Sequence, residues 1–126
     1  MAMFSNLSPH APKALGALRI VSSLLFIAHG TQKLFSFPVA FPMEMNGLLY
    51  AAGIIELVAG LLMLVGFQTR IAAFISSGTM AVAYWLGHAP MGPWPVANMG
   101  DAAILFCFVF LYFVFAGPGA WSIDKD

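Results

Sequence analysis

Three ionisable side chains stand inside long apolar stretches of this chain and are its first candidates for chemistry. His29 and Lys33 lie four residues apart in FIAHGTQKLF, and Glu56 lies in AAGIIELVAG. An imidazole exchanges a proton near neutral pH, and a carboxyl group removed from water must be protonated or paired. We therefore interpret His29 and Glu56 as a candidate catalytic pair that handles the proton of a ligand, with a purely structural pair as the alternative.

The composition of the chain indicates an integral membrane protein. Of its 126 residues, 61% are hydrophobic and only 8% are charged, whereas soluble domains carry about 25% charged residues. The formal net charge is zero and no basic run is present, so nothing suggests a nucleic-acid partner. The single cysteine, Cys107, cannot form an intrachain disulfide. We expect the lipid bilayer to be the main partner of the chain.

Four apolar segments predict one domain, an all-α membrane protein built as a four-helix transmembrane bundle. Each segment is long enough, or nearly so, to cross a hydrocarbon core of about 30 Å as a helix, which satisfies its own backbone hydrogen bonds. A loop rich in proline and glycine, HAPMGPWPVAN, is expected to be non-helical. Thr69 is a candidate N-cap of the third helix. The predicted helices are residues 14–35, 47–66, 70–87 and 100–115.

Polar and small residues gather on particular faces of these helices at 100° per residue. Gly53 and Gly60 flank Glu56 on one face, which lets another helix approach closely. The first segment carries a polar stripe of Arg19, Ser22, Ser23, Phe26, His29, Gly30 and Lys33. The third segment carries a polar seam of Arg70, Ser77, Tyr84 and His88. We expect these faces to point toward neighbouring helices.

Depth along the helices places most of the ionisable groups in one half of the bundle. Lys33, Tyr84, His88 and Asp101 are our candidate ligand-binding residues, beside His29 and Glu56. The alternatives are that Lys33 extends to the lipid head groups, that Tyr84 packs and that His88 belongs to the loop. No two ligands stand one helix turn apart, so we expect no metal site.

The distribution of basic residues predicts the orientation. Lys13, Arg19, Arg70 and Lys125 fall on the side of the termini, and only Lys33 falls on the other side. By the positive-inside rule both termini face the cytoplasm. Arg19 and Arg70 are interpreted as anchors at that interface, or as caps on backbone carbonyls. The N-terminal residues lack the features of a signal peptide, so we expect the first span to be retained.

Three motifs give the chain a resemblance to the DoxX family of small bacterial membrane proteins. They are the stretch from Arg19 to Phe35, then AAGIIELVAGLLMLVGFQTRIAA, and GPGAWSIDK after the last span. The resemblance implies a four-helix protein of the bacterial inner (plasma) membrane. It also implies redox associations, because members of the family include the membrane subunit of a thiosulfate:quinone oxidoreductase. The matching positions are Arg19, Gly30, Lys33, Glu56, Gly60, Gly66, Arg70, Gly117, Gly119, Ser122 and Asp124.

These observations lead to three functional hypotheses. The first is a membrane component of a redox system that binds a quinone in the outer half of the bundle, at most an oxidoreductase subunit. It would hold no cofactor of its own and would receive electrons from a soluble redox enzyme. The second is a non-catalytic membrane anchor or scaffold for such enzymes. The third is a small-solute or proton-coupled permease, for which four helices would have to form a homo-oligomer.

Overall fold

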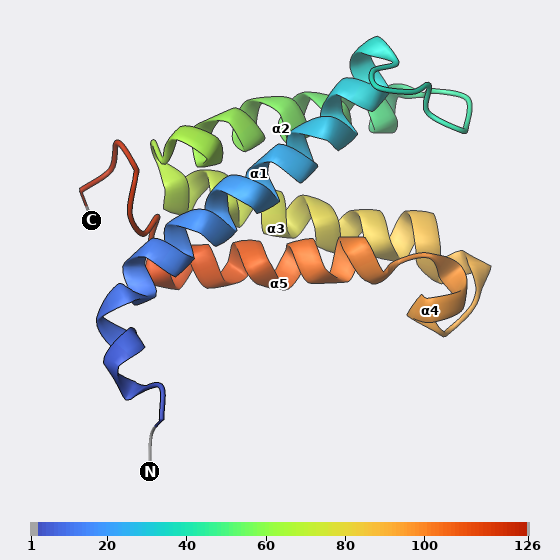
Figure 1. The fold of residues 1–126 in the computed structure, drawn as a ribbon. Helices are drawn as coiled ribbons and strands as arrows, with labels where there is room; N and C mark the ends of the chain where they lie inside the picture. The colour runs from blue at the N-terminus through green and yellow to red at the C-terminus, as the bar shows by residue number, and fades with distance from the viewer. Residues whose placement is uncertain (1–2, 126) are drawn as a thin grey trace.

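The computed structural model describes residues 3–125, and the regular structure in that range is helical throughout (Figure 1). Short 3₁₀ or π-helical turns precede the first α-helix and follow the third. The elements are a 3₁₀ helix Ser5–His10, α1 Ala11–Phe35, α2 Gly47–Val65, α3 Thr69–Ala83, a π-helical turn Tyr84–His88, a 3₁₀ turn Ala89–Met91, α4 Pro95–Asn98 and α5 Asp101–Ala116.

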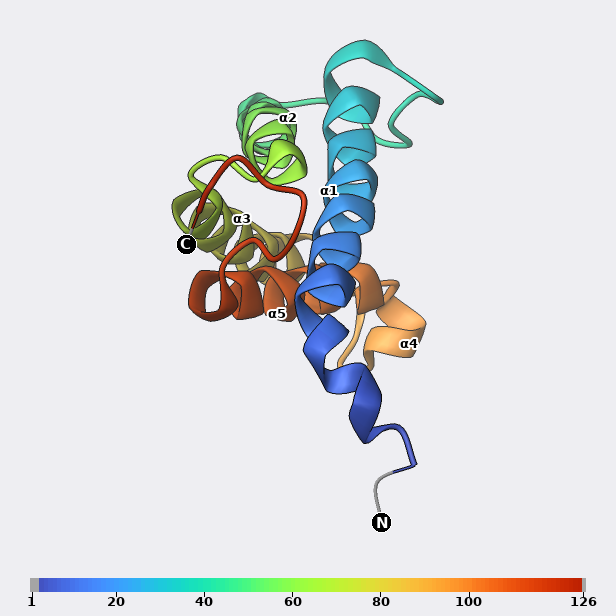
Figure 2. The same ribbon diagram turned by 60° about the vertical axis from the view of Figure 1, so that its left-hand side comes forward.

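The four long helices are arranged as two pairs. α1 packs along α2, and α3 packs along α5, while α2 also contacts α3. α1 crosses the assembly obliquely, so it lies close to α5 at one end and diverges from it toward the other (Figures 1 and 2). The end where the loop of residues 36–46 and α4 lie is therefore called the open end. The opposite end, where α1 begins and residues 117–125 lie, is called the basic end.

The surface of the molecule is suited to a bilayer. Large apolar side chains such as Leu25, Phe74 and Phe108 are more than 45% exposed. By length and composition, the stretches Ser5–Phe35 and Gly47–Val65 could each cross a membrane, and α5 is apolar but shorter, with 16 residues. The prediction of an all-helical chain is confirmed, and membrane crossing by all four helices stays a prediction.

The helix boundaries differ from the predicted ones in three places. α1 begins at Ala11 instead of residue 14, because Pro12 is well placed in a first turn, where its missing N–H is not needed. α3 ends at Ala83, and the wider π-helical turn continues it to His88. The loop predicted to be non-helical contains α4, which begins at Pro95. Proline is well placed there too, because the first turn of a helix does not need its N–H.

Glycines set the spacing between α1 and α2. A Cβ atom at Gly30 would lie 2.9 Å from the backbone nitrogen of Leu57, and one at Gly60 would lie 2.6 Å from Cγ1 of Ile27. Any larger residue would force the two helices apart. The prediction that another helix approaches the glycine-lined face of α2 is confirmed, and that helix is α1. This close approach places Glu56 directly against α1.

Candidate functional site

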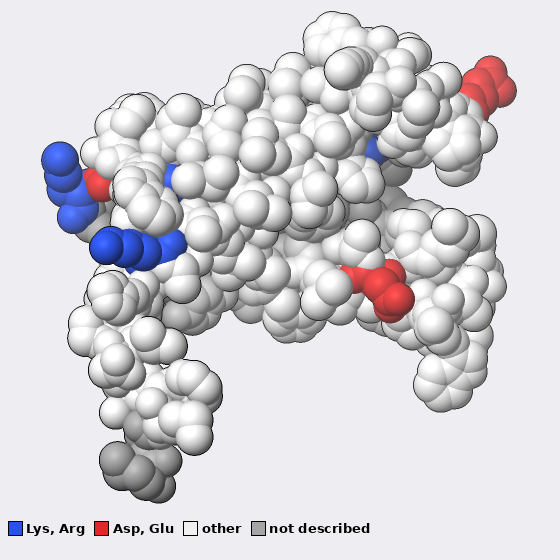
Figure 3. All heavy atoms as spheres, viewed as in Figure 1, with Lys and Arg blue, Asp and Glu red and all other residues white. Residues whose placement is uncertain are grey.

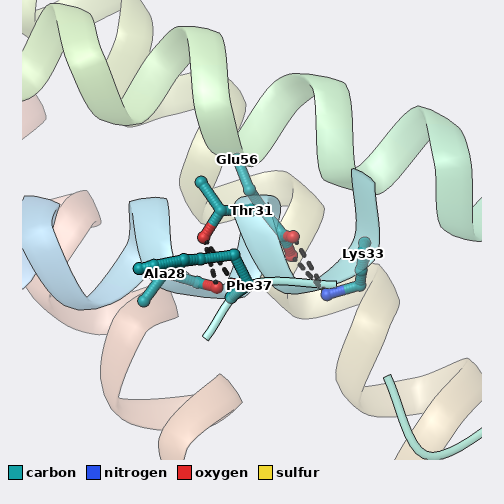
Figure 4. Close-up of polar contacts among 5 residues, drawn as sticks. All are labelled: Ala28, Thr31, Lys33, Phe37 and Glu56. Carbon is teal, nitrogen blue, oxygen red and sulfur yellow. Dashed lines mark hydrogen bonds and ion pairs between the residues drawn. The ribbon is translucent and has the colours of Figure 1, made fainter. Parts of the chain in front are cut away.

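A buried ion pair joins α1 to α2 near the open end. The Nζ atom of Lys33 lies 2.9 Å from Oε1 and 3.2 Å from Oε2 of Glu56, so it donates to both oxygens (Figure 4). The two side chains are only 9% and 3% exposed. Lys33 is therefore neither extended to the lipid head groups nor left without a counter-ion, and its charge is balanced inside the protein.

The predicted partner of Glu56 was wrong. A Cβ atom added at Gly30 would lie 3.1 Å from the Cβ atom of Glu56. The face of α1 that carries Gly30 is therefore the face that packs against α2. Lys33 lies three residues after Gly30 and shares that face. His29, one residue before Gly30, is turned away by about 100°. The helix contact, not the chemical affinity of imidazole for carboxylate, decides the pairing.

The loop of residues 36–46 folds back toward the ion pair. Its start is fixed to α1, because Oγ1 of Thr31 donates to the carbonyl of Phe37 at 2.9 Å and the amide of Phe37 donates to the carbonyl of Thr31 at 3.3 Å (Figure 4). Further along, the ring of Phe41 has its centroid 5.1 Å from the Nζ atom of Lys33. The ammonium group thus has a carboxylate on one side and an aromatic face on another.

His29 lies one helix turn before Lys33 on α1, and it contacts α5 instead of Glu56. Its imidazole packs edge-on against Phe106, with ring centroids 5.8 Å apart and an interplanar angle of 87°. The residue is exposed, in contrast to Phe26, one turn earlier, which is fully buried against Phe106 and Phe110. The imidazole is therefore open to the surroundings at the point where α1 leaves α5.

A third polar cluster organises the loop that leads into α5. Asn98 is fully buried, and its Nδ2 atom donates to the hydroxyl of Tyr84 at 3.1 Å and to the carbonyl of Gly92 at 2.9 Å. Its Oδ1 atom accepts from the amide of Gly100 at 2.9 Å. Nδ1 of His88 lies 3.0 Å from the carbonyl of Asn98 and must donate to it, because a carbonyl oxygen only accepts.

The predicted polar seam of α3 faces α5, as expected for a face that points toward a neighbouring helix. Nη1 of Arg70 donates to the carbonyls of Val114 and Phe115, both at 2.8 Å, and Oγ of Ser77 donates to the carbonyl of Cys107 at 2.7 Å. Carbonyls at the end of a helix lack partners in their own helix. Arg70 thus caps the end of α5, which is the second of the two roles expected for it.

At the basic end, a buried arginine holds the C-terminal segment, defined as residues 117–124. The guanidinium of Arg19 is fully buried and donates to the carbonyls of Pro118, Ala120 and Trp121, the last two at 3.0 and 2.6 Å. Its role is therefore the capping of backbone carbonyls and not attachment to the membrane interface. A segment about 100 residues later in the chain is held against α1 in this way.

Asp124 attaches the same segment to α3. Its carboxylate accepts from the amides of Gln68 at 3.0 Å and Thr69 at 2.9 Å, so Asp124 serves the start of α3, and the prediction of Thr69 as the N-cap was wrong. Burial raises the pKa of the Asp124 carboxyl. The bonds from Thr69 and Gln68 and the charge of Arg19 outweigh burial, so this pKa lies below its usual range.

Five of the six predicted site residues therefore form three separate groups, and the sixth, Asp101, stands apart from them. Lys33 and Glu56 bind each other, Tyr84 and His88 surround Asn98, and His29 contacts Phe106. Asp101 is exposed at the start of α5. Figure 3 shows a notch at the open end, between the part built on α1 and α2 and the part built on α3, α4 and α5. The groups are therefore separate and do not form one constellation.

Three residues near these groups were not among the site residues predicted from the sequence. Phe41 and Phe106 are two of twelve phenylalanines, and nothing in their local sequence marks them. Asn98 does carry a signal, because asparagine two residues before a glycine in a loop is typical of a turn closed by its own side chain. Among residues 3–125, no group of three metal-ligating side chains is close enough to hold a metal ion.

An all-helical chain with membrane-length apolar helices, exposed apolar side chains and internally balanced charges is an integral membrane protein. It belongs to the DoxX family, whose sequence pattern matches residues 14–89. That range contains the ion pair and Arg19 but not the C-terminal segment. The prediction of the family is confirmed.

Two relatives are bacterial. A Haemophilus influenzae protein described as an "uncharacterized protein" is 44% identical over 129 residues, covering 96% of each chain. A Mycobacterium tuberculosis protein described as an "uncharacterized membrane protein" is 26% identical, covering 99% of this chain and 93% of its own. These similarities support a bacterial membrane as the location. No solved structure matches the chain.

Proposed function

We propose that this protein is a membrane component of a bacterial redox system that binds a quinone at the notch of the open end. The single observation that carries the proposal is the position of His29. Its imidazole is exposed on a membrane-length helix, lies edge-on to Phe106, and neighbours the stretch of α1 that holds Lys33. An imidazole donates a hydrogen bond to a quinone carbonyl, and aromatic rings pack against the quinone ring.

In this proposal His29 exchanges the proton, and the ion pair sets the electrostatic environment. Reduction of a quinone to a quinol takes up two electrons and two protons. The electrons come from a soluble redox enzyme, and the protons reach the quinone oxygens through His29. Lys33 and Glu56 together add no net charge, so they provide a fixed dipole beside the site without creating a buried unpaired charge. Tyr84, His88 and Asp101 belong to the part of the molecule built on α3, α4 and α5, on the other side of the notch.

We further propose that four helices cross the bilayer with both termini in the cytoplasm. α3 and the π-helical turn run without a break from Thr69 to His88, which gives about 30 Å at 1.5 Å per residue. α5 gives about 24 Å at the same rise, and it is almost entirely apolar. Basic residues gather at the basic end, as the positive-inside rule requires of a cytoplasmic face.

Substitution of His29 tests the quinone proposal. We expect His29→Ala to weaken the binding of a short-chain quinone by the purified protein by about tenfold, because one hydrogen bond of about 1.4 kcal/mol is lost. Leu25→Ala is the matched control, since Leu25 is also exposed on α1 but lies one turn away. Binding is measured by quinone-dependent quenching of tryptophan fluorescence in detergent. Equal affinities of the wild-type protein and His29→Ala would contradict the proposal.

A second candidate function is a non-catalytic scaffold for soluble redox enzymes. It is favoured by the observation that Lys33 and Glu56 satisfy each other and that Tyr84 and His88 are bound within their own loop. A scaffold predicts that His29→Ala and Glu56→Gln change stability alone, while a redox enzyme still co-purifies. A permease, the third candidate, predicts solute flux in liposomes and a homo-oligomer in detergent.

A further inference from the structure

A cavity of about 440 Å³ lies at the basic end, far from the notch in the fold. Its walls come from three parts of the chain: the first turns of α1, the last turn of α5 and the C-terminal segment with Lys125. Apolar side chains such as Leu15 and Ala116 form one part of the wall, and the hydroxyl-bearing Tyr112 and the charged Lys125 form another. None of these residues takes part in the proposed quinone site.

The C-terminal segment gives this cavity a fixed wall. The amide of Ala120 donates to the carbonyl of Pro12 at 2.9 Å. A Cβ atom at Gly119 would lie 2.6 Å from the backbone nitrogen of Gly16, and Gly119 has a φ of +73°, which favours glycine. The segment thus lies directly on the backbone of α1, and Arg19 holds it there from the inside.

Charge is distributed unevenly between the two ends of the molecule. Figure 3 shows blue surfaces of lysine and arginine concentrated at the basic end and the larger red surfaces of acidic residues at the open end. The carboxylate of Asp124, which lines the cavity, accepts two amide bonds from the start of α3. Among residues 3–125, the basic end carries Lys13, Arg19, Arg70 and Lys125 against Asp124, while the open end carries Lys33 against Glu44, Glu56 and Asp101.

We propose that this cavity is a specific site for one anionic phospholipid. The phosphate lies at Lys125, the glycerol oxygens lie near the hydroxyl of Tyr112, and the acyl chains follow the apolar surface between α1 and α5. The basic end favours an anionic over a zwitterionic head group, because each lysine near a membrane surface contributes about fivefold in affinity. The apolar wall of Leu15 and Ala116 favours a lipid over a free phosphate ion.

The proposal is tested on the full chain in a neutral detergent, with dioleoyl phosphatidylglycerol and dioleoyl phosphatidylcholine as probes. Native mass spectrometry counts bound lipid, and thermal unfolding reports stabilisation. We expect one phosphatidylglycerol to bind preferentially and to raise the Tm. Ala116→Leu and Ala11→Leu, which fill the cavity, should abolish this preference, and Lys125→Ala should weaken it about fivefold. Ala51→Leu, on the exposed side of α2, is the matched control and should behave as the wild type.

Three results would overturn the proposal. One is equal binding of the two lipids by the wild-type protein, which would indicate general lipid contact. Another is an unchanged preference in both cavity-filling variants; Ala11 is exposed, so its variant stays informative even if Ala116→Leu does not fold. The last is equal stabilisation by inorganic phosphate, which would show a site for the free ion. Quinone binding at the open end is unaffected by these variants, so the two proposals fail independently.

Discussion

Arg19 and Lys33 are two buried cations of the same helix, and they are neutralised in different ways. Lys33 binds a carboxylate on the next helix, 23 residues later in the chain. Arg19 binds three backbone carbonyls of a segment that lies 99 to 102 residues later. The first contact joins two helices that follow each other in the chain, whereas the second joins the first helix to the C-terminal segment.

The difference follows from the shapes of the two head groups. A guanidinium is a planar fork with five donors, so it can serve several carbonyls at once. An ammonium is a compact point charge, and a single carboxylate satisfies it well. Carbonyls carry no net charge, and the acidic group whose charge acts on Arg19 is Asp124, in the same C-terminal segment. Loss of Arg19 should therefore affect the attachment of the C-terminal segment, and loss of Lys33 should affect one helix contact.

The largest effect is expected for Arg19→Met. Three charge-assisted hydrogen bonds are lost and three carbonyls lose a partner, so we expect a destabilisation on the order of 4 kcal/mol or more. Thermal unfolding in detergent measures it, and limited proteolysis should cut the C-terminal segment faster. Arg19→Lys retains the charge without the fork and should recover only part of the loss. Full recovery by lysine would contradict the role assigned to the fork.

The next effect concerns the ion pair. Lys33→Met or Glu56→Gln alone leaves a buried charge without its counter-charge and should cost about 3 kcal/mol. The double variant removes both charges, so we expect it to be more stable than either single variant. Thermal or denaturant unfolding of all four proteins gives the coupling energy. Additive single effects would show that the pair contributes nothing specific.

A smaller effect tests the glycine contact that aligns the pair. Gly30→Ala should cost about 1–3 kcal/mol, because its Cβ would press against the backbone of α2. Gly78→Ala is the matched control on α3, where an added Cβ meets nothing within 4 Å. There we expect a gain of about 0.5–1 kcal/mol from helix propensity. The sign of the change in Tm distinguishes the two, and destabilisation by both variants would contradict the geometry.

The smallest effect is expected for Asp124→Asn, at about 1 kcal/mol near neutral pH. The folded-state pKa of Asp124 lies below its ordinary value of 3.8. Its carboxylate therefore contributes stability above the ordinary value, and the contribution is lost as the pH falls through the lower folded value. Unfolding measured from pH 7 downward should show the difference between wild type and variant shrinking below about pH 4. A constant difference would show that ionisation is irrelevant.

Much of the fold was predicted from local patterns, because helices depend on near neighbours in the chain. The apolar segments placed α1, α2, α3 and α5 within a few residues, and the polar seam of α3 was correctly directed at another helix. The site was predicted less well. Six residues were expected to converge, but convergence depends on the angles between helices, which no local pattern contains.

By itself, the sequence determined that this is an all-helical membrane protein. It also determined that charges within its helices must be balanced inside the molecule, because lipid cannot solvate a charge and no water reaches the hydrocarbon core. Only the tertiary structure decided the partners. Gly30 turns Lys33 instead of His29 toward Glu56, and the C-terminal segment brings its carbonyls to Arg19. The physical reason is that composition fixes the cost of burying a charge, whereas the approach of backbones fixes which groups can reach one another.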